Sequence, residues 1–91
     1  MDRKAVDVVI TGRVQGVFFR ARTQEQAARL GVAGWVSNEP DGSVAAHFEG
    51  APDDVDALVA WCRTGPDYAR VERVRATETA PAGADGFDVR G

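Results

Sequence analysis

The chain has 91 residues, of which 44% are hydrophobic and 27% charged, and its formal net charge is −3 at pH 7. A chain of this size forms one small domain that buries only about 60 to 65% of the surface of the unfolded chain, which favours a shallow, loop-built site over an enclosed one. The acidic balance disfavours general nucleic-acid binding, and one cysteine with one histidine excludes an internal disulfide and a typical zinc site.

The N-terminal segment is charged, which argues against an export signal. Residues 1–7 read Met-Asp-Arg-Lys-Ala-Val-Asp, so charges interrupt the apolar stretch that such a signal needs, and no small-residue cleavage site follows. No apolar run approaches the ~20 residues that a bilayer-spanning helix requires. We therefore expect a cytoplasmic protein without a membrane segment.

The first third of the chain predicts a strand, a glycine-bracketed loop and a helix. Residues 5–11 are rich in β-branched residues and place Val6, Val8 and Ile10 on one side at period two, which predicts a half-buried strand that ends at Gly12. Residues 13–18 form the loop. Residues 19–30 are rich in helix formers with an apolar face, and Gly31 provides a C-terminal stop.

The remainder predicts a hairpin, a second helix and two further strands. The hairpin turn contains Asp41-Gly42 after a proline, a strong turn signal. Pro52 opens a helix whose apolar residues recur at helical spacing up to Cys62, and Gly65 follows its end. The predicted strands of this part are 32–37, 43–49, 70–79 and 87–90.

The predicted order is β-α-β-β-α-β with a short extra strand at the C-terminus. This order is that of the split βαβ arrangement, so we predict a ferredoxin-like α/β (α+β) sandwich: an antiparallel sheet with two helices on one face. Many unrelated functions use this fold, and only the site can decide among an enzyme, an RNA binder and a regulatory module.

The loop between the first strand and the first helix is a candidate anion site. Residues 12–20 leave a strand, turn at Gly16 and enter a helix, so successive backbone N–H groups can converge on an anion. Arg20 begins the helix, where its guanidinium could bind two phosphate oxygens. The spacing matches neither a Walker loop nor a dinucleotide fingerprint. From these residues alone, the alternative that Gly16 only permits a turn and Arg20 is solvated stays open.

Two longer segments resemble the acylphosphatase family. Residues 12–20 read Gly-x-Val-Gln-Gly-Val-x-Phe-Arg, and residues 30–44 read Leu-Gly-Val-x-Gly-Trp-Val-x-Asn-x-x-Asp-Gly-x-Val. The resemblance continues to the closing Phe-x-Val-Arg of residues 87–90. It implies a single acylphosphatase-like domain over residues 1–91 with the ferredoxin-like fold.

The resemblance also implies an activity and its residues. The family hydrolyses the carboxyl-phosphate bond of acyl phosphates to a carboxylate and inorganic phosphate, without a metal or another cofactor. Arg20 would bind the phosphoryl group, and Asn38 would hold the attacking water. The backbone amides implied to share the phosphoryl group are those of Gln15, Gly16, Val17, Phe18 and Phe19. The expected partners are small-molecule acyl phosphates, not nucleic acid or a membrane, and we expect a monomer.

This chemistry needs few protein groups. The leaving carboxylate is stable and needs no strong acid, while backbone donors and one guanidinium match the charge on the transferring phosphoryl group. The carboxamide of Asn38 can orient a water without titrating, and the bound phosphate itself could take the proton. We expect no catalytic part for His47, which faces away from the predicted core side, or for Cys62, a small buried hydrophobe.

Two departures from the family pattern and two alternatives remain. Glu39 follows Asn38 where relatives often have an uncharged residue, and the chain ends Arg90-Gly91 where many relatives end in an aromatic, so a contact from the terminus to the site is in doubt.

One alternative is a non-catalytic module of the same fold that binds phosphate, another anion or RNA. The other is a domain of a larger protein that uses carbamoyl phosphate, although the chain reads as standalone.

Overall fold

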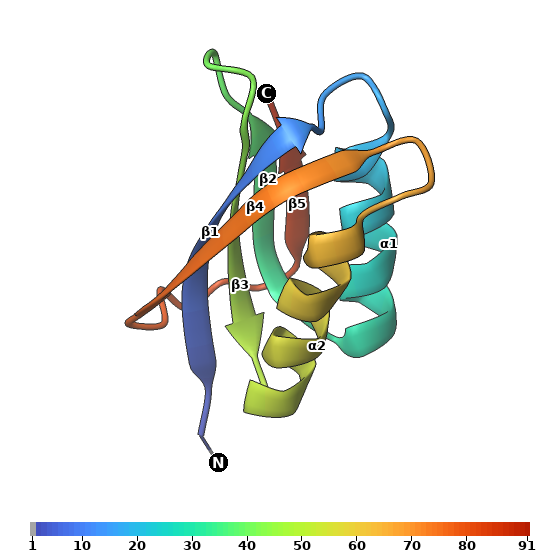
Figure 1. Ribbon diagram of the computed structural model, residues 1–91. Coiled ribbons are helices and arrows are strands. Elements are labelled where there is room, and N and C mark those ends of the chain that lie inside the picture. The colour runs from blue at the N-terminus through green and yellow to red at the C-terminus, as the bar shows by residue number, and fades with distance from the viewer. Residues whose placement is uncertain (1) are drawn as a thin grey trace.

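Two helices pack against one face of a five-stranded sheet (Figure 1). This computed structural model describes residues 2–91. The strands are β1 (Lys4–Arg13), β2 (Ala33–Asn38), β3 (Val44–Gly50), β4 (Arg70–Thr79) and β5 (Phe87–Arg90). The helices are α1 (Phe19–Leu30) and α2 (Pro52–Thr64). The predicted order of elements is confirmed, with the two helices on the same face.

The sheet is mixed, because one of its strands runs parallel to its neighbour. The strand order is β4-β1-β3-β2-β5, and every pair is antiparallel except β2 with β5. The expectation of an antiparallel sheet therefore needs correction at β5. The reason is that β4 ends beside Ala5 and β2 begins beside Glu49, both at one end of the sheet. The loop of residues 80–86 stays at that end, so β5 starts in the direction of β2 (Figure 1).

The first strand extends past its predicted end. A bulge lies between Thr11 and Gly12, after which Gly12 and Arg13 continue the pairing with β4. Gly12 has φ 125, and a Cβ there would lie 2.1 Å from the carbonyl oxygen of Arg70. Glycine is therefore required for close approach of the two backbones and does not end the strand.

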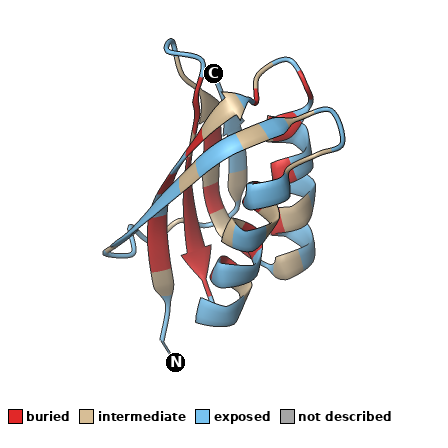
Figure 2. Cartoon of the chain, viewed as in Figure 1, coloured by how far each residue is buried: buried red, intermediate tan, exposed pale blue. Residues whose placement is uncertain are grey.

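The core lies between the helices and the sheet. Alternate residues of β1 and β3 are buried on this side, and Figure 2 shows buried residues concentrated in these central strands. Phe19 of α1 packs on Trp61 of α2 with ring centroids 5.6 Å apart. Each fully buried large side chain contributes about 1.5 to 3 kcal/mol. The largest fully buried hydrophobic side chains include Phe19, Phe48, Ile10 and Leu58.

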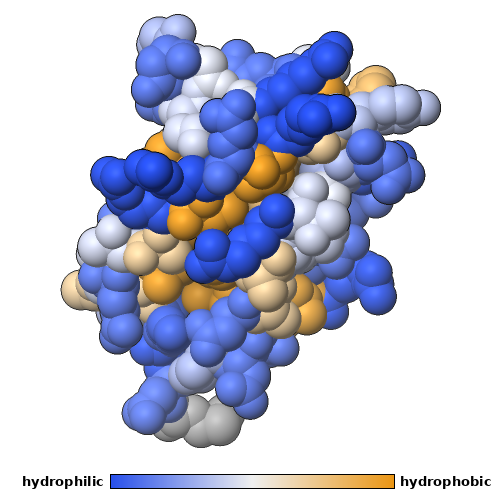
Figure 3. Space-filling view, in the orientation of Figure 1, coloured by the Kyte–Doolittle hydropathy of each residue, from blue (hydrophilic) through white to orange (hydrophobic). Residues whose placement is uncertain are grey.

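Partly buried side chains extend the core where α2 packs against β4. Val59, Val71 and Val74 contact the core cluster from these two elements. Figure 3 shows apolar surface across the middle of this face, bordered by hydrophilic side chains. Among residues 2–91, no helix combines the length and the apolar character that a membrane crossing needs.

Three segments converge at the end of the sheet where β1 finishes. Ile10 and Asn38 both pair with Val44, so the end of β1 and the end of β2 lie beside the start of β3. Arg90, at the end of β5, pairs with Ser37 next to Asn38. The loop before α1, the turn after β2 and the C-terminus therefore meet at one edge.

Candidate active site

The N-terminus of α1 lacks the groups that normally stabilise a helix start. Phe18 occupies the N-cap with φ 66 and ψ 21, and no side chain among residues 2–91 donates or accepts a capping hydrogen bond there. The first turn holds Arg20 and Arg22 and no acidic residue, whereas the first turn of α2 holds Asp53 and Asp54. Unpaired N–H groups and the positive end of the helix dipole, with the guanidinium of Arg20 beside them, suit an external anion.

The loop before α1 is anchored by its own side chains. Val14 and Val17 are 1% and 6% exposed and belong to the core cluster. Between them Gly16 takes φ 73, a left-handed conformation that glycine adopts without strain. Since the loop is pinned on both sides of this turn, its backbone N–H groups are held in place rather than left mobile.

Arg20 and Asn38, which are far apart in the sequence, line one pocket of about 320 Å³. The residues that line it are Val14, Gly16, Phe18, Phe19, Arg20, Ala21, Asn38 and Val89. A larger hollow of about 700 Å³ lies toward the other end of α1 and is lined by Arg3 and Gln24 among others. The structure thus brings the two predicted catalytic residues together, while their roles stay predictions.

The C-terminal strand holds the guanidinium of Arg20. Nη1 of Arg20 donates a hydrogen bond of 2.9 Å to the backbone carbonyl of Arg90. The side chain of Arg90 lies over the ring of Trp35, with Cζ 5.0 Å from the ring centroid. The sequence left a contact from the C-terminus to the site in doubt, because the chain lacks a terminal aromatic residue. The backbone carbonyl of Arg90 makes this contact, so no aromatic terminal residue is needed for it. The other N–H groups of Arg20 remain available to an oxyanion.

The turn after Asn38 is held by its own hydrogen bonds. The N–H of Glu39 donates to the carbonyl of Ser43 at 2.9 Å. Oδ1 of Asp41 accepts from the N–H of Ser43 at 2.9 Å and from its hydroxyl at 2.6 Å. These bonds from the Ser43 hydroxyl and N–H hold the pKa of Asp41 below its ordinary value. Asn38, the last residue of β2, therefore precedes an ordered turn.

Gln15 links the two segments of the site. Its Nε2 donates to the carbonyl oxygens of Glu39 and Ser43, both at 2.8 Å. The resemblance implied only a backbone role for Gln15, and this side-chain bridge was not predicted because a single sequence gives no signal for it. The side chain of Val17 is in the core, and neither Gln15 nor Val17 lines the pocket. The side chains of both residues therefore support the loop from behind.

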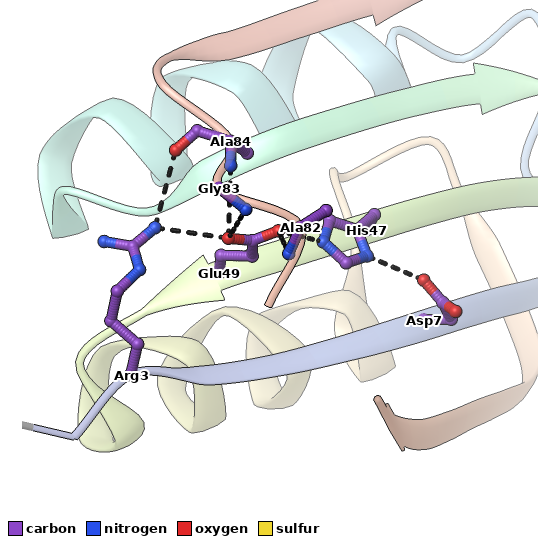
Figure 4. Close-up of polar contacts among 7 residues, drawn as sticks. All are labelled: Arg3, Asp7, His47, Glu49, Ala82, Gly83 and Ala84. Atoms are coloured by element: carbon purple, nitrogen blue, oxygen red, sulfur yellow. Dashed lines mark hydrogen bonds and ion pairs between the residues drawn. The ribbon is translucent and has the colours of Figure 1, made fainter. Parts of the chain in front are cut away.

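A network of ionisable side chains centred on the buried His47 and Glu49 lies on the open face of the sheet (Figure 4), and none of its members lines this pocket. Nε2 of His47 is 2.6 Å from Oε2 of Glu49, and Nδ1 is 2.7 Å from Oδ1 of Asp7. Glu49 also accepts hydrogen bonds from the N–H groups of the 80–86 loop and from Arg3. His47 faces away from the core as expected, but Trp35 stacks on it and it is only 7% exposed.

The network shifts the pKa values of His47 and Glu49 in opposite directions. Burial lowers the pKa of His47, but the hydrogen bonds to Asp7 and then Glu49 outweigh it, so the pKa lies above its ordinary value. Burial raises the pKa of Glu49, but its bonds to His47, to the loop N–H groups and to Arg3 outweigh it and hold the pKa at about 2. Both shifts favour the charged form of the group concerned.

Cys62 and His47 are the remaining candidates for a catalytic or metal-binding role. Cys62 is buried, and burial raises its pKa to about 12, so the thiolate is scarce at neutral pH. Within residues 2–91, no three His, Cys, Asp or Glu side chains are arranged to hold a metal ion. Both ring nitrogens of His47 are directed at carboxylates instead.

The comparison with known proteins identifies one family over nearly the whole chain. The family model described as acylphosphatase matches residues 6–89. An acylphosphatase of Rubrobacter xylanophilus is 59% identical over 88 residues, which cover 96% of this chain and 80% of the relative. One of Nocardioides sp. is 57% identical over 88 residues, covering 97% of this chain and 89% of the relative.

The fold agrees with these sequence matches. The solved structure of an acylphosphatase from Coxiella burnetii has a TM-score of 0.94 and 34% identity, and the match covers 98% of this chain and 94% of that one. The predicted ferredoxin-like fold is therefore confirmed. Since the family match and the relatives extend over nearly the whole chain, the protein belongs to the acylphosphatase family of enzymes.

Proposed function

We propose that the protein hydrolyses the carboxyl-phosphate bond of acyl phosphates in the pocket between α1 and Asn38, releasing a carboxylate and inorganic phosphate. The observation that carries this proposal is the meeting of Arg20, Asn38 and the uncapped N-terminus of α1 in one pocket. Membership of the acylphosphatase family supports the same reaction. Residues 1–91 would act as one domain and as a monomer, without a metal or another cofactor.

The phosphoryl group binds at the N-terminus of α1. Backbone N–H groups of the loop and first turn, from Gln15 to Phe19, donate to its oxygens together with the guanidinium of Arg20. The transition state of phosphoryl transfer spreads negative charge over the equatorial oxygens, so fixed donors stabilise it more than they stabilise the substrate. The hydrogen bond from Arg20 to the carbonyl of Arg90 fixes the guanidinium before substrate arrives.

Asn38 orients the nucleophile. Its side-chain oxygen accepts a hydrogen bond from a water molecule, which is thereby aimed at phosphorus. The water oxygen forms a bond to phosphorus, the bond from phosphorus to the acyl oxygen breaks, and that oxygen leaves as a carboxylate. A phosphoryl oxygen takes the proton of the water. Because a carboxylate leaves without protonation, neither His47 nor a carboxylate side chain is required.

The test is hydrolysis of benzoyl phosphate by the purified protein with chelator present. We expect turnover by the parent and losses of about 100-fold or more in Arg20→Gln and Asn38→Ala, the range found for loss of one donor to a developing oxyanion. Arg22→Gln is the matched control, because Arg22 is also in the first turn of α1 but pairs with Glu25 at 3.1 Å. Circular dichroism confirms that each variant is folded.

The alternative is a module that binds an anion without turning it over. A folded parent without hydrolysis of any acyl phosphate, but with phosphate binding by calorimetry that depends on Arg20, would establish that alternative. Binding of single-stranded RNA by the inactive parent would favour the RNA-binding form of the same fold.

A further inference from the structure

The pocket has apolar surface at its mouth that the reaction does not use. Phe18 is 71% exposed and Val89 is 41% exposed, and both line the pocket that holds Arg20 and Asn38. They come from different elements, the loop before α1 and β5. Two segments thus leave apolar side chains unburied beside the reacting centre.

The backbone of Phe18 has a strained conformation. It is the only non-glycine residue among residues 2–91 with a positive φ, 66°. A bulky side chain in the left-handed region is strained, and such strain gathers at functional sites. Because most of the ring is exposed, packing of the ring in the core does not compensate the strain. The backbone instead places an apolar ring at the mouth of the pocket.

The charged residues that line the pocket also bear on which substrates it can bind. Of the described residues that line it, Arg20 is the only cation, and none is a carboxylate. The phosphoryl group occupies Arg20, so a second negative charge on the substrate would find no partner among these residues. The part of the substrate beyond the carboxyl carbon would instead meet Phe18 and Val89.

We infer that the site selects acyl phosphates with an uncharged, apolar acyl group, aromatic or branched aliphatic, over those whose acyl group carries another anionic group. This inference rests on the proposed function. The phosphoryl group is bound as described above, and Phe18 with Val89 buries the apolar surface of the acyl group. A phenyl ring that is partly buried there gains a preference of about tenfold over a methyl group.

The experiment compares three substrates: benzoyl, acetyl and succinyl phosphate, the last with a free carboxylate. The kcat/KM of each, measured by phosphate release, is divided by its rate of uncatalysed hydrolysis to remove intrinsic reactivity. The expected order is benzoyl about tenfold above acetyl, with succinyl at or below acetyl.

The variants Phe18→Asn and Val89→Thr test the apolar surface that Phe18 and Val89 form, called here the apolar wall. Asn tolerates the left-handed conformation, so it removes the ring and keeps the backbone, and Thr has nearly the shape of Val. Each should lower the benzoyl-to-acetyl ratio several-fold through a higher KM for benzoyl phosphate. The ratio is the readout because Phe18 also belongs to the loop that binds the phosphoryl group. Tyr68→Ser is the control, since Tyr68 is 78% exposed and does not line the pocket.

The variant Val89→Lys tests the charge argument, because an added cation should raise the succinyl-to-acetyl ratio several-fold. The inference is overturned if benzoyl and acetyl phosphate are hydrolysed with equal efficiency, or if the benzoyl-to-acetyl ratio is unchanged in both Phe18→Asn and Val89→Thr. In either case hydrolysis of acetyl phosphate leaves the proposed function standing. Absence of hydrolysis of all three substrates by the folded parent removes both.

Discussion

Nε2 of His47 lies 2.6 Å from Oε2 of Glu49, a carboxylate without exposed surface. The other ring nitrogen faces Asp7 at 2.7 Å, so both contacts are hydrogen bonds only when both nitrogens carry protons. Glu49 in turn accepts the N–H groups of Ala82, Gly83 and Ala84. One buried ion pair therefore anchors the loop that carries the chain across to β5, whose end holds Arg20.

Replacement of Glu49 by Gln should destabilise the fold strongly. The amide keeps the shape but leaves the imidazolium without its buried counter-ion, which costs about 3 kcal/mol in the free energy of unfolding. Protonation of Glu49 at low pH also destabilises the fold. Unfolded Glu49 takes up its proton near pH 4.5 and the folded group only at about 2, so its contribution is present above 4.5 and is lost as the pH falls toward 2.

Urea denaturation at a series of pH values measures both effects. Glu49→Gln should lack the part of the acid dependence that Glu49 supplies. The matched control is Glu72→Gln on β4, since Glu72 is exposed and forms no ion pair with the described residues; it should change stability by less than about 0.5 kcal/mol. Equal stability of the two variants would contradict the anchoring role.

His47 should titrate above its ordinary pKa of 6.5. Its partners stabilise the protonated ring in the folded state, so this contribution is fully present below 6.5 and is lost as the pH rises through the folded pKa. The chain has one histidine, so the imidazole signals in an NMR titration are unambiguous. Asp7→Asn should lower the measured pKa and leave the fold intact, while a pKa at or below 6.5 in the parent would refute the doubly bonded ring.

Loss of the Gln15 bridge should impair turnover more than binding. Gln15→Leu removes both hydrogen bonds from Nε2 to the carbonyls of Glu39 and Ser43, and the turn after Asn38 loosens. If Asn38 orients the water, kcat should fall about tenfold with little change in KM. Steady-state kinetics on benzoyl phosphate measure the split. A rise in KM at constant kcat would instead place Gln15 in substrate binding.

Removal of Arg90 and Gly91 should weaken catalysis without unfolding the protein. The truncation deletes the carbonyl that accepts from Arg20 at 2.9 Å, and a hydrogen bond to a charged group contributes about 1.5 to 3 kcal/mol. We expect a fall of about tenfold or more in kcat/KM. Arg90→Ala is the companion variant, because it removes the contact with Trp35 but keeps the carbonyl, and its loss should be smaller.

A side chain at Gly34 should prevent folding. Gly34 has φ 141, and a Cβ there would lie 1.7 Å from the carbonyl oxygen of His47 on the paired strand. Gly34→Ala must therefore separate β2 from β3. Gly83→Ala is the control: its φ is also positive, 83°, but no described atom lies within 4 Å of its Cβ, so the cost is about 1 kcal/mol. Thermal unfolding followed by circular dichroism distinguishes the two.

The elements could be predicted from the sequence because they depend on local patterns, whereas the candidate site residues were predicted from the resemblance to the acylphosphatase family. Alternation in β1, helical spacing in α2 and the glycine stop at Gly31 agree with the structure. Arg20 and Asn38 were predicted together because each lies in one of the two family-like segments, and the structure places both residues in one pocket. The end of β1 was misplaced, since Gly12 permits a close approach to β4 that no local pattern encodes.

The local pattern of apolar and turn residues thus determined by itself the order of elements and the core face, while the candidate catalytic pair came from the resemblance of two motif segments to the acylphosphatase family. Only the tertiary structure decided the direction of β5, the bond from Arg20 to Arg90, the bridge from Gln15 and the burial of Glu49. The physical reason is that local periods report which face of an element is apolar. Contacts between distant segments depend on strand register and on the path of the connecting loops, which are settled only when the chain packs.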